Sequence, residues 1–449
     1  MNKRARILLI AAAVIAVALI GLIFIRNLID FPVYYSAGRS LLAGRTDLYA
    51  PDFALGRVMD YRYPPFFLVA LIPLWLLSYK AAAYLWYLLS VLQIAGCVAV
   101  LRREVNRQGP MKWIWAISFF AVGQYFIQII HYGNAQLLAI FLLFVSFYLI
   151  ARRKVAMAAL LVAVSITIKL TPLLALPYFA LKRQWKYLLL TGFFLLAVNI
   201  APAAYFGFDR NAELLKSWYE KVILDQEFHE VNGPINLSLK GQLRRYFTEV
   251  DYTQRIDGDT RYRQINIASL SSDKTDGAWM VIAGGLFLSG MALIWWRQQR
   301  LRNGPAGKTK TDEEAREDST VRERDGNLSP LELGLMICLM LLAGPLTSKI
   351  YFIALLWPVI SLAGFAFSHS TPAARFGRGA LIFIAIANFV LPLLPGSSIQ
   401  RLLLVIGADF YLNSVLVAAL VYVLVSEARA LPSLSAEPRT ESPSATRTP

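Results

Sequence analysis

The sequence predicts an all-α polytopic membrane protein. Of its 449 residues, 57% are hydrophobic and only 16% are charged, and the apolar residues form runs long enough to span a bilayer as helices. The net charge of +16 comes largely from basic residues that fall between these runs. In a soluble chain such a charge would suggest nucleic-acid binding, but this placement is typical of cytoplasmic loops, so we expect no nucleic-acid partner.

The first half of the chain alternates spanning runs with polar turns. An apolar run over 7–25 follows a basic N-terminus and has no small-residue cleavage site after it, which predicts an uncleaved first helix. The stretch 65–78 is apolar but short, which favours a re-entrant or interfacial piece. The next helices are predicted at about 82–101, 113–130 and 135–150.

Residues 155–181 are nearly continuous apolar sequence, interrupted by Lys169 and Pro172. The basic cluster that follows must return to the cytoplasm, so we expect two short helices that meet near Lys169. A span at about 187–206 leads to a second polar region with a return helix at 278–296. The last spans, which bring the total to about twelve, are predicted at about 331–344, 350–367, 379–395 and 401–426.

These segments predict four regions. The first is a transmembrane module over 1–296 with external loops at 27–64 and 207–277, followed by a flexible cytoplasmic linker at 297–329. Transmembrane helices occupy 330–426, and a disordered cytoplasmic tail occupies 427–449. More than half of the Lys and Arg residues fall in the segments that this topology places in the cytoplasm, so both termini are expected there.

Metal and nucleotide signatures are missing from the sequence. Cys97 and Cys338 lie inside predicted spans, so we expect no disulfide in an external loop and no cysteine-based metal site. The three histidines fall at separate places, and no P-loop or G-x-G-x-x-G pattern follows a strand. The external acidic residues form no compact cluster, so no cofactor is required, although the sequence is compatible with a divalent ion.

The stretch 30–65 carries the first candidate functional residues. Asp30 ends an apolar run, where a carboxylate costs free energy unless it has partners or a task. The tyrosines Tyr34, Tyr35 and Tyr63 follow it in the same loop. Apolar positions between Phe31 and Leu42 recur near helical spacing, which predicts a short interfacial helix with its apolar side on lipid.

Five short sequence blocks follow one another over roughly residues 20–250. They are Asp30-Phe31 through Tyr34-Tyr35 with Ala37-Gly38 and Gly44, Tyr63-Pro64-Pro65, Gly133-Asn134-Ala135-Gln136, Lys169-Leu170-Thr171-Pro172, and Asn236-Leu237-Ser238 with Arg244. This set resembles the GT-C integral membrane glycosyltransferases, and within them the polyprenol-phosphate-mannose-dependent mannosyltransferases of glycosyltransferase family 87. The resemblance implies transfer of a hexose, with mannose expected, from a polyprenyl-phosphate donor to an external acceptor hydroxyl. A glycolipid or glycan acceptor is expected, and the sequence leaves a protein acceptor open.

The resemblance also implies a site and a place in the cell. Transfer would occur with inversion on the external face of a plasma membrane, in a bacterial, multi-pass protein embedded in lipid. Asp30 takes the role of general base, which accepts the proton of the acceptor hydroxyl. The donor phosphate or substrate would be bound by a set of polar residues, which are Lys169, Arg244, Arg245, Lys349, Asn134, Gln136, Asn236, Tyr34, Tyr35 and Tyr63.

One block departs from the family pattern. Where the family has a Ser-Pro and then a Trp followed by paired histidines, this chain has Gly344-Pro345-Leu346-Thr347-Ser348-Lys349-Ile350-Tyr351. We expect Lys349 to supply a replacement cation, or to mark the membrane interface.

The residues alone leave alternatives open. Asp30 is also suited to capping the helix that begins at Phe31, and Lys169 to snorkelling towards the interface. The two loop arginines fit a solvated face, the amides fit helix pairing, and the tyrosines fit interfacial anchoring. A secondary transporter is the alternative function, because about twelve spans and an intramembrane lysine are also transporter features, although the sequence shows no matching halves.

Overall fold

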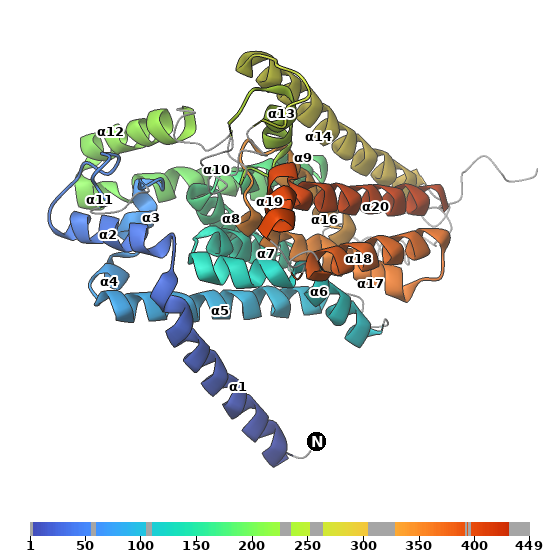
Figure 1. The fold of residues 1–449 in the computed structure, drawn as a ribbon, viewed down its shortest axis with the longest axis horizontal. Helices are drawn as coiled ribbons and strands as arrows, with labels where there is room; N and C mark the ends of the chain where they lie inside the picture. Colours follow the sequence, from blue (N-terminus) through green and yellow to red (C-terminus); the bar gives the residue numbers. More distant parts are fainter. Residues whose placement is uncertain are drawn as a thin grey trace, which may run out of the picture.

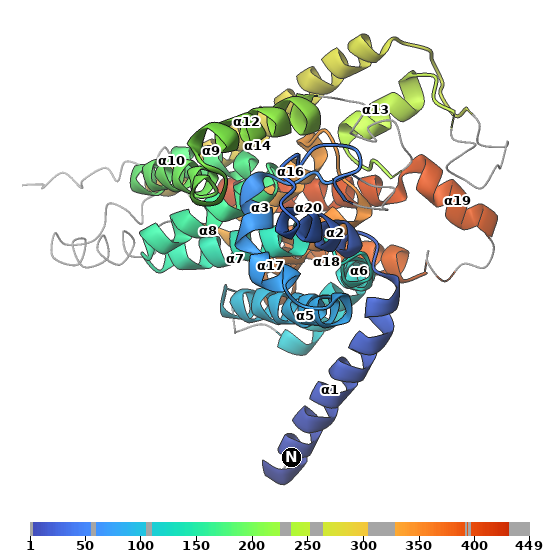
Figure 2. The same cartoon turned by 90° about the vertical axis from the view of Figure 1, so that its left-hand side faces the viewer.

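The computed structural model describes residues 3–54, 60–104, 110–224, 235–251, 264–303, 328–390, 393 and 397–430. These residues are helical or irregular, and no strand occurs among them. Figure 1 shows a bundle of helices from which α1 (Lys3–Phe24) projects, and the rotated view in Figure 2 shows the same projection. The all-α class predicted from the sequence is confirmed.

The N-terminal part alternates long and short helices. They are α2 (Phe31–Leu42), α3 (Pro65–Ala70), α4 (Ile72–Trp75), α5 (Tyr79–Glu104), α6 (Met111–Tyr132), α7 (Gln136–Ala151), α8 (Val155–Ile168), α9 (Leu176–Leu181), α10 (Trp185–Ile200), α11 (Ala203–Phe206), α12 (Phe208–Trp218) and α13 (Leu239–Phe247). Short 3-10 turns occupy Ile25–Asn27 and Thr171–Ala175, and a π-helical turn occupies Tyr219–Leu224.

The C-terminal part contains the longest helix and the most buried one. Its helices are α14 (Ser272–Asn303), α16 (Pro330–Ala343), α17 (Leu356–Ser368), α18 (Pro372–Val390), α19 (Ser397–Ile406) and α20 (Ala408–Ala430), with a 3-10 turn over Lys349–Leu355. Helices α16, α17 and α20 pack with α6, α7 and α9 around one large apolar core. The two parts of the chain therefore share a core.

Helices occupy the predicted apolar segments, but twelve full spans are not confirmed. Among the described residues, seven helices are long and apolar enough to cross a membrane, and the bent pair Ile15–Asn27 and Phe31–Leu42 would make an eighth. Four further apolar helices are shorter, such as α7 with 16 residues. At 1.5 Å per residue α7 is about 24 Å long, less than the roughly 30 Å of a hydrocarbon core.

The predicted interruption at Lys169 is confirmed. Helix α8 ends at Ile168, Lys169 is extended with φ −144° and ψ 128°, and the chain resumes as a 3-10 turn that contains Pro172. A proline lacks the backbone donor and disfavours helical geometry in the residue before it, so the helix cannot run through this point. Lys169 therefore lies between two short helices.

The predicted lipid contact of α2 is wrong. The helix forms as expected, but its apolar side is covered by protein, because Phe31 and Ala37 are fully buried and the Phe31 ring lies 5.7 Å from that of Trp86. Gly38 lies so close to the Trp75 ring that a Cβ there would be only 2.3 Å from it. Helical periodicity identifies an apolar face but does not say what covers it.

The predicted linker and tail begin too early. Helix α14 continues to Asn303, so residues 297–303 are helical, and residues 304–327 lie outside the described residues. Arg297 is bound by two carboxylates, at 2.7 Å from Glu332 and 3.1 Å from Glu427, which ties this end of α14 to α16 and α20. Helix α20 likewise includes residues 427–430, and residues 431–449 lie outside the described part.

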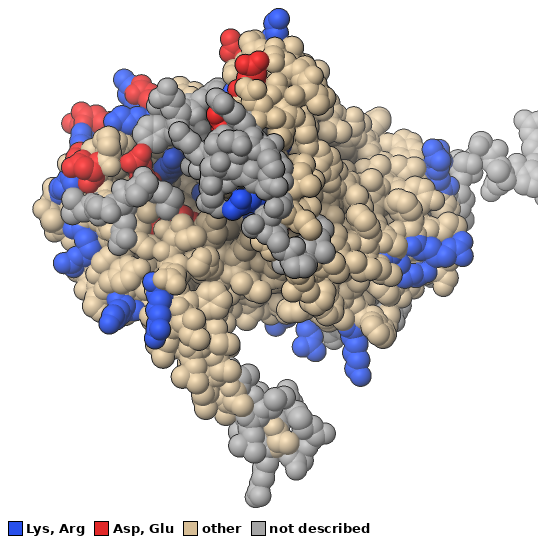
Figure 3. Space-filling model, in the orientation of Figure 1, with Lys and Arg blue, Asp and Glu red and all other residues tan. Residues whose placement is uncertain are grey.

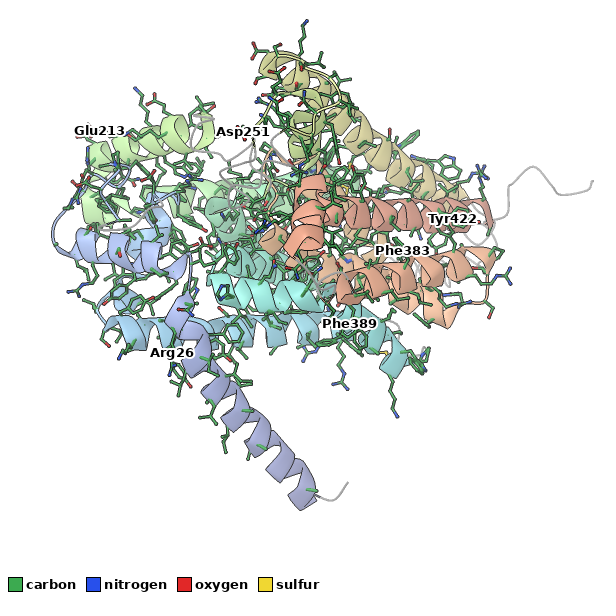
Figure 4. All side chains as sticks on the ribbon, in the orientation of Figure 1. Arg26, Glu213, Asp251, Phe383, Phe389 and Tyr422 are labelled. Atoms are coloured by element: carbon green, nitrogen blue, oxygen red, sulfur yellow. The ribbon has the colours of Figure 1, made fainter. Side chains whose placement is uncertain are left out.

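Charge and apolar surface are distributed unevenly. On the face in Figure 3, acidic side chains gather near α12 and the start of α14, whereas Lys and Arg alone appear along the lower and right-hand edges. Phe383, Phe389 and Tyr422 point outward from α18 and α20 (Figure 4), with exposed fractions of 55%, 52% and 43%. Such apolar helix surfaces suit contact with lipid, as a multi-pass membrane protein requires.

Candidate active site

A cavity of about 1250 Å³ lies where the two polar regions meet the C-terminal helices. Trp218 of the second region donates its indole N–H to the Arg62 carbonyl of the first, at 3.3 Å, and both residues line the cavity. Other walls come from the end of α6, the break at Lys169, and residues 343–351. The cavity therefore gathers residues from segments far apart in the sequence.

Asp30 lines this cavity from the turn immediately before α2. Its backbone N–H donates to the Tyr132 carbonyl at 2.8 Å, and its Oδ2 accepts a hydrogen bond from Asn134 Nδ2 at 2.7 Å. The side chain makes no capping hydrogen bond to α2, so the capping alternative is wrong. The carboxylate is instead held by the turn that follows α6.

That turn determines how Asn134 is oriented. Gly133 ends α6 with a φ of +62°, and a Cβ there would lie 3.1 Å from the Phe31 Cβ, so both conformation and space favour glycine. Asn134 Oδ1 accepts the Gln136 backbone N–H at 2.7 Å. Because the amide oxygen is bound locally, the amide N–H₂ is directed to Asp30.

The surroundings of Asp30 affect its protonation in opposite directions. Burial raises the pKa of this carboxyl above its ordinary value, and this effect is the largest. The hydrogen bond from Asn134 lowers the pKa, as do the positive charges of Lys169 and Arg62. The net result is a raised pKa, which makes Asp30 a stronger base than an exposed aspartate.

Lys169 lies on the same cavity, beside two tyrosines. Its Nζ donates to the Tyr351 hydroxyl at 3.3 Å and lies 4.7 Å from the centre of the Tyr63 ring. The Tyr63 hydroxyl is hydrogen-bonded to that of Tyr34 at 2.8 Å. No carboxylate of the described residues lies within 4 Å of Lys169, so its charge is available to an anion in the cavity.

A second polar cluster on the cavity lining surrounds Asp409. Lys349 Nζ lies 3.8 Å from Asp409 Oδ2, and the Tyr125 hydroxyl donates to Asp409 Oδ1 at 2.9 Å. Lys349 lines the cavity as the sequence led us to expect, but Asp409 was not predicted. Its signal was a carboxylate inside the predicted span 401–426, the same criterion that selected Lys169.

The structure does not place Arg244 and Arg245 on the cavity wall. Both are buried, with exposed fractions of 4% and 1%. Arg244 binds Asp276 at 2.8 Å, and Arg245 donates to the Asn236 carbonyl at 3.2 Å. The cation of α13 that lines the cavity is Lys240, which lies 3.0 Å from the same Asp276. Sequence reasoning thus selected a segment that reaches the cavity, but a different side chain of that segment lines it, because an arginine in a polar loop can also turn inward.

Three other predicted residues also lie off the cavity wall. Asn236 joins two loops, since its Nδ2 donates to the Pro345 carbonyl at 3.1 Å and its Oδ1 accepts the Thr347 N–H at 3.2 Å. Tyr35 donates its hydroxyl to the Leu77 carbonyl at 2.8 Å. Gln136 is fully buried, and its side-chain atoms have no hydrogen-bond partner among the described residues. Of the predicted set, the cavity brings together Asp30, Tyr34, Tyr63, Asn134, Lys169 and Lys349.

Sequence reasoning also missed several lining residues. Arg62 was not selected because attention fell on the Tyr63-Pro64-Pro65 block that follows it. The glutamines of α6 were not selected because they lie inside a predicted span. Within the described ranges, no group of three or more His, Cys, Asp or Glu side chains is placed to hold a metal ion. The Asp47 and Asp52 carboxylates instead pair with Arg45, at 2.7 Å and 3.1 Å.

Comparisons with known proteins identify a family for this chain. The sequence model of glycosyltransferase family 87 matches residues 61–308, a range that includes Asn134 and Lys169 but begins after Asp30. A polyprenol-phosphate-mannose-dependent alpha-(1-2)-phosphatidylinositol pentamannoside mannosyltransferase from Mycolicibacterium smegmatis is 26% identical over 239 residues, covering 50% of this chain and 47% of the relative. The chain thus aligns with about half the length of this curated relative.

Among solved structures, ArnT from Cupriavidus metallidurans bound to undecaprenyl phosphate is similar to this chain with a TM-score of 0.36. The sequence identity is 15%, and the similarity covers 95% of this chain and 78% of ArnT.

Proposed function

Because the chain belongs to glycosyltransferase family 87, we propose that it transfers a hexose, with mannose as the expected sugar, from a polyprenyl phosphate to an acceptor hydroxyl. The observation that carries this proposal is a single cavity that contains both Asp30 and Lys169. A carboxylate can accept the proton of the attacking hydroxyl, and an ammonium group can bind the leaving phosphate.

Asp30 is the proposed general base. As the acceptor oxygen forms a bond to the anomeric carbon, its proton passes to the Asp30 carboxylate, and the bond from that carbon to the phosphate oxygen breaks. The electron pair leaves with the polyprenyl phosphate. A single displacement of this kind inverts the anomeric carbon, so a β-linked donor gives an α-linked product. Asn134 is the proposed positioning residue, because its amide holds one carboxylate oxygen at 2.7 Å.

Lys169 is the proposed group for the donor phosphate. Its ammonium contacts Tyr351 and the Tyr63 ring rather than a carboxylate of the described residues, so an anion would meet a positive charge that is not neutralised locally. Lys240 adds a second cation to the lining, although Asp276 offsets its charge. Negative charge that develops on the leaving phosphate would be stabilised by these groups.

An apolar part of the same cavity suits a polyprenyl chain. Leu170, Leu173 and Leu404 line it with exposed fractions of 40%, 44% and 36%. Leu170 and Leu173 belong to the break that carries Lys169, so a lipid tail could bind there while its phosphate meets the ammonium group. We place the reaction on the external face of a bacterial plasma membrane, following the predicted topology. Family membership favours this transferase over a secondary transporter.

The test uses membranes from cells that produce the full chain and matched membranes that lack it. Radiolabelled polyprenyl-phosphate mannose, glucose and galactose are supplied separately with a native lipid extract, with and without a divalent-metal chelator. We expect label from the mannose donor in a new glycolipid only when the protein is present. Transfer from another donor would show that its sugar, and not mannose, is the one transferred. No transfer from any of the donors would contradict the proposal.

A further inference from the structure

A polar strip crosses one wall of the cavity. Gln124, Gln128 and Tyr132 are spaced by four residues on α6, so they lie on one face of this helix, and all three line the cavity. At 1.5 Å per residue the strip is about 12 Å long. Amide side chains in an apolar spanning helix are costly unless they meet polar partners, so a row of them along a cavity needs a reason.

The strip runs between the surroundings of Asp409 and those of Asp30. At one end, Gln124 Nε2 donates to Asn388 Oδ1, and the neighbouring Tyr125 hydroxyl donates to Asp409 at 2.9 Å. At the other end, the Tyr132 carbonyl accepts the backbone N–H of Asp30 at 2.8 Å. A molecule lying along this wall would therefore extend from Asp409 to the proposed base.

The middle of the strip has unused hydrogen-bonding capacity. Gln128 Oε1 is buried and accepts no hydrogen bond from any described residue, and Thr171 Oγ1, across the same cavity lining, is in the same state. Buried polar atoms are usually hydrogen-bonded, and an unpaired acceptor is costly. Because both residues line the cavity, a small rotation of either side chain would turn its free acceptor towards a hydroxyl group of a bound ligand.

The charges on this wall distinguish the two substrates. Lys169 has no carboxylate partner among the described residues and lies at the break after α8, whereas Lys349 is offset by Asp409, which lies near Gln124 of the strip. A donor phosphate is therefore favoured near Lys169 and disfavoured along α6. Carboxylate, amide and hydroxyl side chains all hydrogen-bond to hydroxyl groups, so a row of them can bind a ligand that carries several hydroxyls.

We infer that the strip from Asp409 through Gln124 and Gln128 to Tyr132 is the acceptor subsite, and that it binds a saccharide chain. The terminal sugar presents its hydroxyl to Asp30, and the sugar before it contacts Gln128. This inference rests on the proposed function and makes it more specific, because it selects a glycan acceptor of at least two sugar units over an isolated hydroxyl such as that of a serine side chain.

The first measurement is equilibrium binding, which requires no donor. Tritiated octyl α-dimannoside is titrated against the purified full chain in lipid nanodiscs, with octanol as the monohydroxyl competitor. We expect saturable binding that octanol does not displace, and a fivefold to tenfold weaker affinity in Gln128→Met, which keeps the side-chain volume but removes the amide. The matched control is Gln93→Met on α5, which lies outside the cavity lining and should bind like the wild type.

The second measurement is transfer kinetics with polyprenyl-phosphate mannose as the donor. In Gln128→Met, the KM for octyl α-dimannoside should rise fivefold to tenfold, while the KM for the donor stays within twofold of wild type. A rise confined to the donor KM, or unchanged binding in Gln128→Met, would overturn the subsite. If the wild type binds the dimannoside but transfers no sugar, the proposed function fails while the subsite stands.

Discussion

Two of the carboxylates that line the cavity, Asp30 and Asp409, differ in how many of their oxygens have a polar partner. Among the described residues, Asp30 uses Oδ2 to accept a side-chain hydrogen bond from Asn134, and Oδ1 accepts none. Asp409 has the Tyr125 hydroxyl at Oδ1 and the Lys349 ammonium near Oδ2. A base needs an oxygen that can approach a proton, so this difference favours Asp30 over Asp409 as the proposed base.

We expect the largest effect on the reaction rate when the Asp30 carboxylate is replaced. Asp30→Asn keeps the shape of the side chain but cannot accept the proton at neutral pH, so we expect kcat to fall by about 10² to 10⁴. Initial rates at equal protein abundance give the comparison. Asp52→Asn is the matched control, because this carboxylate belongs to the same loop and is 76% exposed. Equal rates for the two variants would remove Asp30 from the reaction.

Lys169 and Arg244 also differ in their surroundings, because Lys169 faces the cavity and Arg244 is paired with a carboxylate. Lys169→Met removes the ammonium that faces the cavity, so we expect kcat/KM for the donor to fall by about 10² to 10³ while the protein stays folded. Arg244→Met breaks a buried pair with Asp276, and we expect a lower Tm instead. Thermal unfolding and donor kinetics measured on both variants test this assignment. A lower Tm in Lys169→Met with unchanged kinetics would reverse it.

Asp409→Asn should have a smaller and different effect. Asparagine retains an oxygen for the Tyr125 hydroxyl but loses the charge beside Lys349, so we expect the acceptor KM to rise about tenfold with kcat within twofold. The split between KM and kcat is the informative readout. A fall in kcat as large as that of Asp30→Asn would mean that both carboxylates take part in proton transfer.

The smallest effect is a shift in pH dependence. A base works only when deprotonated, so transfer should fall as pH drops through the raised pKa of Asp30, at a higher pH than an ordinary aspartate would give. The hydrogen bond from Asn134 lowers this pKa, so Asn134→Leu should move the acidic limb to still higher pH. Profiles of kcat/KM against pH for both proteins test this. An unchanged limb in Asn134→Leu would show that another group titrates.

The sequence by itself determined the local features. Apolar run length located the helices, and Pro172 required the break that leaves Lys169 between two short helices. Asp30 was recognisable because a carboxylate at the end of an apolar run costs free energy and is usually kept for binding or catalysis. Each of these inferences depends only on neighbouring residues, which is why the chain alone was sufficient for them.

Tertiary structure decided which side chains face the cavity. Arg244 turns inward to Asp276 while Lys240, four residues earlier, lines the cavity, and nothing in their spacing distinguishes them. The same holds for α2, whose apolar side meets Trp75 and Trp86 rather than lipid. Asp409 and Asp30 are far apart in the sequence and share a cavity only because long-range packing brings the start of α20 to Tyr125 of α6, and Asp30 to the end of that helix. Periodicity and composition describe a helix, whereas the neighbours of its faces depend on the whole fold.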